Sequence, residues 1–286
     1  MGEILSDIDK GVLTPEAFWI IEAGELNKTN KLRVGFEDGK ERRVYRRGTG
    51  PAVIVIAEVP GITPEVVAFA DRVAELGCTA VLPHLFGDPG AEATTLNEIG
   101  VISWACVSRE FATWATGKTS PVTVWLRALA RHEHERCGGP GVGVVGMCLT
   151  GGFALAMMVD EVVVAPVLSQ PSLPFALTKS RKRDIGVSPD DLARVKQRTA
   201  AGVDVLGLRF TCDMAVPEER FARLRAELGD AFVGVEIDSS PGNPHDIRKR
   251  AHSVLTGDLV DEPGHPTRDA LDQVLDLFRK RLLPEA

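Results

Sequence analysis

The segment Gly143-Val-Val-Gly-Met-Cys148-Leu-Thr-Gly-Gly152 is the strongest indication of the fold that we expect for this chain. The apolar run 141–146 is typical of a strand that is buried on both faces, and residues 151–159 are typical of a helix. A buried strand therefore leads into a helix through a tight turn that carries Cys148. Such a turn lifts one side chain above the sheet, because small flanking residues avoid clashes there.

Apolar runs alternate with helical patterns along the rest of the chain. Further strands are expected at 52–57, 79–83, 161–166, 203–210 and 231–237. Further helices are expected after Thr63-Pro64 and Ser120-Pro121, at 189–198 and 217–228, and over the last residues up to Leu282. This alternation predicts an α/β fold with a mostly parallel central sheet and helices on both faces. We expect one domain over residues 1–286, in which 1–47 form an N-terminal extension and a β-hairpin that turns at Asp38-Gly39.

Composition excludes several classes of protein. The chain has 286 residues with 33 basic and 40 acidic side chains, a formal charge of −7 that argues against a nucleic-acid partner. No apolar run approaches the ~18–20 residues of a membrane helix, so no membrane partner is expected. The N-terminal residues lack a signal segment. Five cysteines without CxxC spacing fit a reducing cytoplasm and no metal site.

The turn at Cys148 suits covalent chemistry. The start of the following helix offers free N–H groups and a positive dipole end, which stabilise a thiolate or a developing oxyanion. The pattern resembles G-x-S-x-G with cysteine in place of serine, and we expect the β-branched Thr150 at the last position to relax the turn slightly. The alternative is a buried cysteine in a nucleotide-binding sheet. The residues Gly141-x-Gly143-x-x-Gly146 match G-x-G-x-x-G, but they lie within the strand and lack the expected acidic residue about 20 positions later.

An acid and a histidine should follow such a nucleophile along the chain. Asp213 stands just after a strand and just before a helix, where it can orient an imidazole or merely cap the helix. His252 lies in the loop after the strand that ends at residue 237, and we select it, with His265 as the alternative. A turn role is sufficient for His265, and His245 is a loop residue or a substrate contact. The pair in His132-Glu-His134 is expected on a solvated helix end, because residues two apart on a helix point apart.

Residues 48–283 resemble the dienelactone hydrolase family, a Cys-His-Asp branch of the α/β-hydrolases. Four segments carry this resemblance most specifically: Gly146-Met-Cys-Leu-Thr-Gly-Gly152, Val55-Ile-Ala-Glu-Val-Pro-Gly-Ile-Thr-Pro64, Cys212-Asp-Met-Ala-Val-Pro217 and His252-Ser-Val-Leu255. The resemblance implies an α/β-hydrolase domain with Cys148, His252 and Asp213 as a catalytic triad.

The resemblance also assigns roles outside the triad. Glu58 matches a glutamate that contacts the thiol, and it would keep that thiol unreactive until substrate binds. Its other interpretation is an exposed residue at a strand end. Backbone N–H groups of Leu149 and near Val59 would form an oxyanion hole. Arg109 would grip a substrate carboxylate, unless it forms only a surface ion pair.

The expected reaction is hydrolysis of a small ester or lactone, in which Cys148 forms an acyl-enzyme. No metal or organic cofactor is required, and the partner is a small molecule that carries a carboxylate. The protein itself is expected to be a monomer or a homodimer. The alternatives are a thioesterase or general carboxylesterase, a ligand-binding protein of the same fold without catalysis, and a thiol redox sensor, although no second cysteine lies near Cys148 in sequence.

Overall fold

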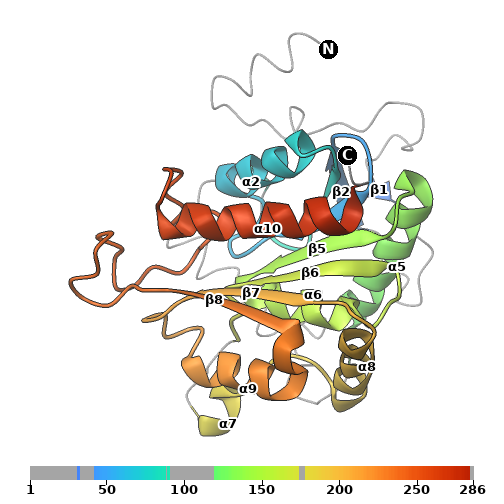
Figure 1. Ribbon diagram of the computed structural model, residues 1–286. Helices are drawn as coiled ribbons and strands as arrows, with labels where there is room; N and C mark the ends of the chain where they lie inside the picture. Colours follow the sequence, from blue (N-terminus) through green and yellow to red (C-terminus); the bar gives the residue numbers. More distant parts are fainter. Residues whose placement is uncertain (1–30, 33–41, 88, 91–118, 174–177, 284–286) are drawn as a thin grey trace, which may run out of the picture.

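The computed structural model describes residues 31–32, 42–87, 89–90, 119–173 and 178–283. Its centre is a twisted sheet of eight strands in the order β1-β2-β4-β3-β5-β6-β7-β8 (Figure 1). The strands are β1 (Lys31–Leu32), β2 (Arg42–Arg47), β3 (Ala52–Ile56), β4 (Thr79–Pro83), β5 (Val142–Met147), β6 (Val163–Ser169), β7 (Val205–Phe210) and β8 (Phe232–Ile237).

The six strands from β4 to β8 in this order run parallel, and β1 and β2 pair antiparallel at one side. Ile56 of β3 lies opposite Gly146 of β5, while Met147 of β5 lies opposite Ser169 of β6. The carboxyl ends of the parallel strands therefore meet at one edge of the sheet, which is where ligand sites form in such folds.

Helices cover both faces of the sheet. They are α2 (Pro64–Glu75), α5 (Pro121–Cys137), α6 (Gly151–Met157), α7 (Lys179–Lys182), α8 (Pro189–Ala200), α9 (Glu218–Leu228) and α10 (Pro266–Leu282), with 3-10 turns η2 (Cys148–Thr150) and η3 (Gly229–Ala231). Helices α2 and α10 pack on one face, and α5, α6, α8 and α9 on the other (Figure 1). The predicted α/β fold, with a mostly parallel sheet between two helical layers, is confirmed.

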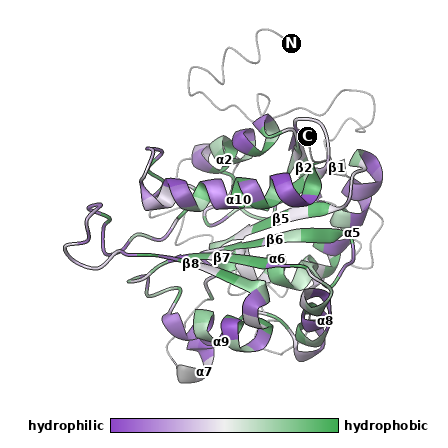
Figure 2. Cartoon of the chain, viewed as in Figure 1, coloured by the Kyte–Doolittle hydropathy of each residue, from purple (hydrophilic) through white to green (hydrophobic). Residues whose placement is uncertain are grey.

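Each face of the sheet has its own hydrophobic core. Val53 and Val55 of β3 pack toward α2 and α10, while Ile54 and Ile56 pack toward α5 and α6. The strands are mostly hydrophobic and the helices carry hydrophilic outer faces (Figure 2). This pattern explains why the central strands read as continuous apolar runs in the sequence.

Three of the helices begin with a Ser/Thr-Pro pair, as expected for two of them from the sequence. Thr63, Ser120 and Ser188 each cap a helix by accepting a hydrogen bond from the N–H of the third helical residue. A proline follows each cap at the first helical position, where its missing N–H costs nothing.

The bounds of several elements differ from the sequence-based expectations. Strand β6 continues to Ser169, and α7 occupies part of the stretch that we expected to be loop. His132 and His134 lie partly exposed near the end of α5, whereas Glu133 between them is fully buried, with its carboxylate paired with the buried Arg46 of β2.

Some expectations fall on parts of the chain that are not described. The Asp38-Gly39 turn, most of 84–119 and Arg109 lie outside the described residues, as does most of the N-terminal extension. Leu32 pairs with Arg42 in the short antiparallel contact between β1 and β2. Within the described ranges, no helix combines the length and the apolar character needed to span a bilayer.

Candidate active site

The turn between β5 and α6 places Cys148 at the carboxyl edge of the sheet. The backbone of Cys148 has φ of 54°, in the left-handed region, which costs a non-glycine residue about 1–3 kcal/mol. A Cβ atom at Gly146 would lie 2.3 Å from the carbonyl oxygen of Thr150. Glycine is therefore required at position 146, because the chain turns back closely on itself here.

Thr150 stabilises this turn through its hydroxyl group. The side chain is fully buried, accepts a hydrogen bond from the Met147 N–H at 2.8 Å and lies 2.9 Å from the Ile56 carbonyl oxygen, to which it donates. Thr150, which we expected to relax the turn, forms these hydrogen bonds within it, and Cys148 has a left-handed conformation there.

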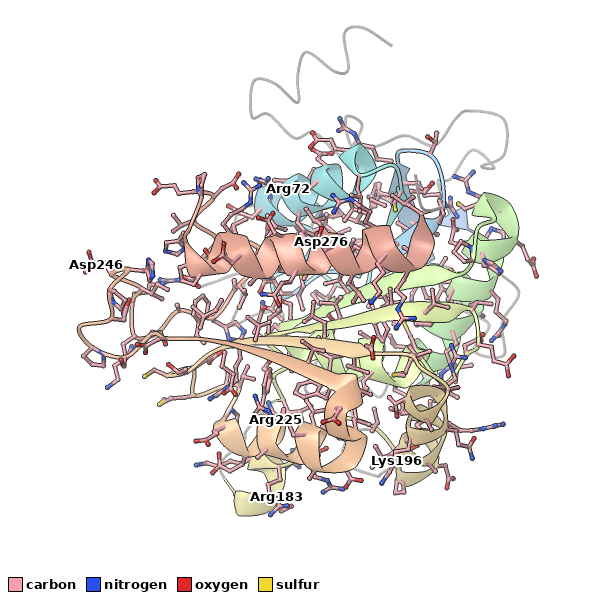
Figure 3. All side chains as sticks on the ribbon, in the orientation of Figure 1. Arg72, Arg183, Lys196, Arg225, Asp246 and Asp276 are labelled. Atoms are coloured by element: carbon pink, nitrogen blue, oxygen red, sulfur yellow. The ribbon has the colours of Figure 1, made fainter. Side chains whose placement is uncertain are left out.

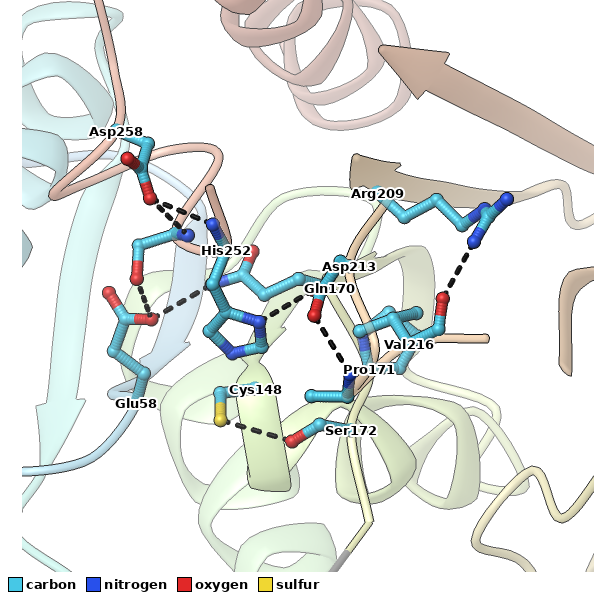
Figure 4. Close-up of polar contacts among 12 residues, drawn as sticks. Glu58, Cys148, Gln170, Pro171, Ser172, Arg209, Asp213, Val216, His252 and Asp258 are labelled. Atoms are coloured by element: carbon cyan, nitrogen blue, oxygen red, sulfur yellow. Dashed lines mark hydrogen bonds and ion pairs between the residues drawn. The ribbon is translucent and has the colours of Figure 1, made fainter. Parts of the chain in front are cut away.

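Asp213 and His252 meet beside Cys148. Asp213 follows β7, is largely buried and also accepts a hydrogen bond from the Ala215 N–H at 2.9 Å. Its Oδ2 atom lies 2.6 Å from Nδ1 of His252, which is part of the loop between β8 and α10. The imidazole lies between Asp213 and the Cys148 sulfur (Figure 4). Burial lowers the pKa of His252, but the charge of Cys148 and the hydrogen bond with Asp213 outweigh it and raise this pKa well above its usual value.

Asp258 fixes the loop that carries His252. Its Oδ2 atom accepts hydrogen bonds from the backbone N–H groups of His252 at 2.8 Å and Ser253 at 3.0 Å, and its Oδ1 atom accepts one from Arg248 Nε at 2.6 Å. Burial would raise the pKa of Asp258, but these hydrogen bonds hold it below its usual value. The sequence does not reveal this residue, since an aspartate six positions after a histidine in a loop belongs to no periodic pattern.

Glu58 lies just after β3 and is buried within the same network. Its carboxylate accepts hydrogen bonds from Gln170 Nε2 at 2.8 Å, from Ser253 Oγ at 2.8 Å and from the hydroxyl of Thr256. Burial outweighs these hydrogen bonds and raises the pKa of Glu58. Glu58 is buried, so its alternative interpretation as an exposed residue at a strand end is wrong. The hydrogen bonds of Glu58 with described residues, however, go to these three side chains and not to the thiol.

The Cys148 sulfur contacts a residue that the sequence did not suggest. Its Sγ atom lies 3.0 Å from Oγ of Ser172, and the Ser172 N–H donates a hydrogen bond to the Cys148 carbonyl oxygen at 2.9 Å (Figure 4). Ser172 follows β6 in a short segment with Gln170, whose φ of 35° is unusual for a residue other than glycine.

The remaining predicted residues have other surroundings. Leu149 is the second residue of η2, a position whose N–H has no partner within the helix, and Val59 follows Glu58. His265 caps α10, and its Nδ1 atom lies 2.7 Å from the Thr267 hydroxyl, so the turn role expected for it is confirmed. His245 packs its ring edge-on against that of His265. Among the described residues, no group of His, Cys, Asp or Glu could hold a metal ion.

The sheet and the turn that bears Cys148 define an α/β-hydrolase fold. The model of the dienelactone hydrolase family matches residues 43–282, and the chain belongs to that family.

Solved structures share this fold at low sequence identity. A candidate dienelactone hydrolase from Klebsiella pneumoniae is 18% identical with a TM-score of 0.54, over 85% of this chain and 94% of that one. A dienelactone hydrolase from Anabaena variabilis is 16% identical with a TM-score of 0.54, over 88% and 96%. A cold-adapted esterase from an Arctic intertidal metagenomic library is 14% identical with a TM-score of 0.53, over 88% and 91%. No curated protein matches this chain.

Proposed function

We propose that this protein hydrolyses a small carboxylic ester or lactone by way of an acyl-enzyme on Cys148. The observation that carries the proposal is the 2.6 Å contact between Asp213 and His252, with the imidazole facing a sulfur at the tip of the turn after β5. Family membership and the esterase among the solved structures of the same fold support an ester as substrate.

The proposed reaction has two halves. In the first, the Cys148 thiolate forms a bond to the ester carbonyl carbon, and the alcohol leaves with the proton that His252 carries. In the second, His252 takes a proton from water, the resulting hydroxide attacks the thioester, and the acid leaves as Cys148 returns to the thiolate. Asp213 holds the imidazole in the required orientation throughout. The N–H groups of Leu149 and Val59 are the proposed donors to the oxyanion.

Glu58 has a different role in this proposal from the one that the resemblance implied. Through Ser253 and Thr256 it holds the loop on which His252 stands. Its charge also interacts with that of His252. We therefore assign Glu58 as a positioning residue for the imidazole.

The substrate class in this proposal is the one that the resemblance to the dienelactone hydrolases implies. We propose a small carboxylate-bearing ester or lactone, with Arg109 as the group that grips the carboxylate, acted on by a monomer or homodimer in the cytoplasm. The dienelactone ring fits this description, and so do other small esters.

The test compares turnover of p-nitrophenyl acetate, a dienelactone and an acyl-thioester by the wild type, Cys148→Ala and Cys137→Ser. Cys137 is a matched control, because it is a half-buried free cysteine at the end of α5. We expect Cys148→Ala to abolish ester turnover and Cys137→Ser to retain it, with an acetyl group detected on Cys148 after rapid quenching. Full turnover by Cys148→Ala would refute the proposal, and preference for the thioester would favour a thioesterase.

A further inference from the structure

Arg220 of α9 is an unusual residue for the interior of this protein. It is only 1% exposed, and among the described residues its side chain donates hydrogen bonds to backbone carbonyl oxygens alone. A buried guanidinium without a hydrogen-bonded carboxylate is costly. Burial accordingly lowers its pKa to about 10. Such a residue calls for an explanation beyond the packing of α9.

The partners of Arg220 lie on three separate segments around the site. Its NH1 atom donates to the carbonyl oxygens of Pro171 at 2.7 Å and Ala215 at 2.9 Å, and its Nε atom donates to that of Asp184 at 2.7 Å. Pro171 immediately precedes Ser172, and Ala215 stands two residues after Asp213. One side chain therefore connects the segment after β6 with the segment after β7.

The segment after β6 is also held from its other sides. Gln170 donates to Glu58 at 2.8 Å, and its backbone N–H donates to the Leu208 carbonyl oxygen at 2.8 Å. A Cβ atom at Gly151 would lie 2.6 Å from Cβ of Pro171. The glycine after Thr150 therefore lets Pro171 approach the turn that bears Cys148, and the approach brings Ser172 Oγ to 3.0 Å from the sulfur.

We infer that Ser172 donates a hydrogen bond to the Cys148 thiolate in the resting protein, and that Arg220 is the positioning residue that holds Ser172 in place. Ser172 then contacts the reacting sulfur and is a catalytic residue of the reaction proposed above, on which this inference rests. The charges of His252 and Arg220 interact with that of Cys148, and the charges of Asp213 and Glu58 interact in turn with that of His252. In this setting the hydroxyl is a neutral donor that stabilises the thiolate until a substrate carbonyl takes its place.

The test is the pH profile of alkylation by iodoacetamide at Cys148, followed by mass spectrometry of its peptide. A hydrogen bond to a charged group stabilises that group enough to change its titration midpoint by about one pH unit. We expect Ser172→Ala to raise the midpoint by about that amount. Ser188→Ala removes another buried serine hydroxyl, at the start of α8, and should leave the midpoint unchanged. An unchanged or lowered midpoint in Ser172→Ala overturns the inference, since the hydroxyl would then not donate to the thiolate.

Arg220→Lys tests the positioning role, because lysine keeps the charge but lacks the planar group that reaches several carbonyls. We expect Arg220→Lys to raise the pH midpoint of Cys148 alkylation, as Ser172→Ala does. In a double variant that carries both changes, Arg220→Lys should cause no further rise. If Arg220→Lys raised the alkylation midpoint of Ser172→Ala by as much as it raises that of the wild type, Arg220 would act independently of Ser172. Failure of Arg220→Lys to fold, seen by circular dichroism, would assign Arg220 to overall stability. Either result overturns the positioning role.

Turnover of p-nitrophenyl acetate separates this inference from the proposed function. A wild type that hydrolyses the ester, combined with an unmoved midpoint in Ser172→Ala, refutes the role of Ser172 alone. If the wild type shows no ester turnover that Cys148→Ala abolishes, the hydrolase proposal is refuted. The alkylation profiles still decide in that case whether Ser172 stabilises the thiolate.

Discussion

The Nδ1 atom of His252 lies 2.6 Å from Oδ2 of Asp213, although 39 positions separate the two residues in the chain. Asp213 follows β7, and His252 belongs to the loop after β8, the neighbouring strand in the sheet. The carboxylate therefore accepts the Nδ1 proton and leaves Nε2 to face the sulfur.

Asp213→Asn reverses this hydrogen bond, because the amide of asparagine donates to Nδ1 and favours the tautomer with the proton on Nε2. We expect turnover of p-nitrophenyl acetate to fall by roughly a hundredfold or more, with the fold retained. Asp276→Asn, on the exposed face of α10, is the matched surface control (Figure 3). Equal activity of Asp213→Asn and the wild type would exclude an orienting role for Asp213.

The ionisation of His252 gives a second prediction. Burial lowers its pKa, but the charge of Cys148 and the hydrogen bond with Asp213 raise it well above 6.5. Nuclear magnetic resonance of labelled histidines should show one ring in the wild type that titrates well above that value. Cys148→Ala removes the largest raising influence, so the midpoint of this ring should fall, while Cys137→Ser should leave it in place. If the titration midpoint of this ring were the same in Cys148→Ala and the wild type, the charge of Cys148 would not act on the His252 imidazole.

The same shift has a consequence for stability. A histidine whose pKa is raised on folding contributes stability that is fully present below its unfolded pKa and is lost as pH rises through the folded value. The contribution of His252 should therefore be present below pH 6.5 and disappear at alkaline pH. Comparison of urea unfolding of the wild type and His252→Gln across this range measures it, and a pH-independent difference would contradict the assignment.

Glu58 should make the free energy of unfolding depend on pH from the acidic range upward. Its pKa is raised above 4.5 because burial disfavours the carboxylate, so the folded state binds the proton more tightly than the unfolded state. This contribution is fully present below pH 4.5 and is lost as pH rises through the raised value. Glu58→Gln cannot ionise, and we expect the wild type to lose stability relative to this variant as pH rises. Urea unfolding from pH 4 to 8 measures the difference, and Glu65→Gln, at an exposed position in the first turn of α2, is the control.

The sequence was sufficient to predict those parts of the candidate site that depend on local pattern. The run 141–152 specified a buried strand, a tight turn and a helix, and the structure has β5, η2 and α6 there. Asp213 and His252 could be selected because each follows a recognisable parallel strand, and such strands bring their carboxyl ends to one edge of the sheet.

The residues that the sequence did not reveal depend on tertiary contacts. Ser172 follows a strand whose end was misplaced, and Asp258 accepts hydrogen bonds from a loop without periodicity. Arg220 stands beside two glutamates in an amphipathic helix and resembles any exposed charge, although it is buried. Only the folded chain shows which charged side chain of a helix points inward.

Glu133 is a second charged helix residue whose burial the sequence does not reveal, and its ion pair leads to a further prediction. It is fully buried on α5, and Arg46 of β2 contacts both of its carboxylate oxygens. Removal of one member of a buried ion pair leaves the other charge without compensation, so Glu133→Gln should reduce the free energy of unfolding by about 3 kcal/mol. Glu135→Gln, at an exposed position of the same helix, should change it little. Because two apolar residues can replace a buried pair, Arg46→Met combined with Glu133→Leu should recover most of the loss. Urea unfolding of the four proteins tests this, and equal stability of Glu133→Gln and Glu135→Gln would show that the pair contributes no more than a surface contact.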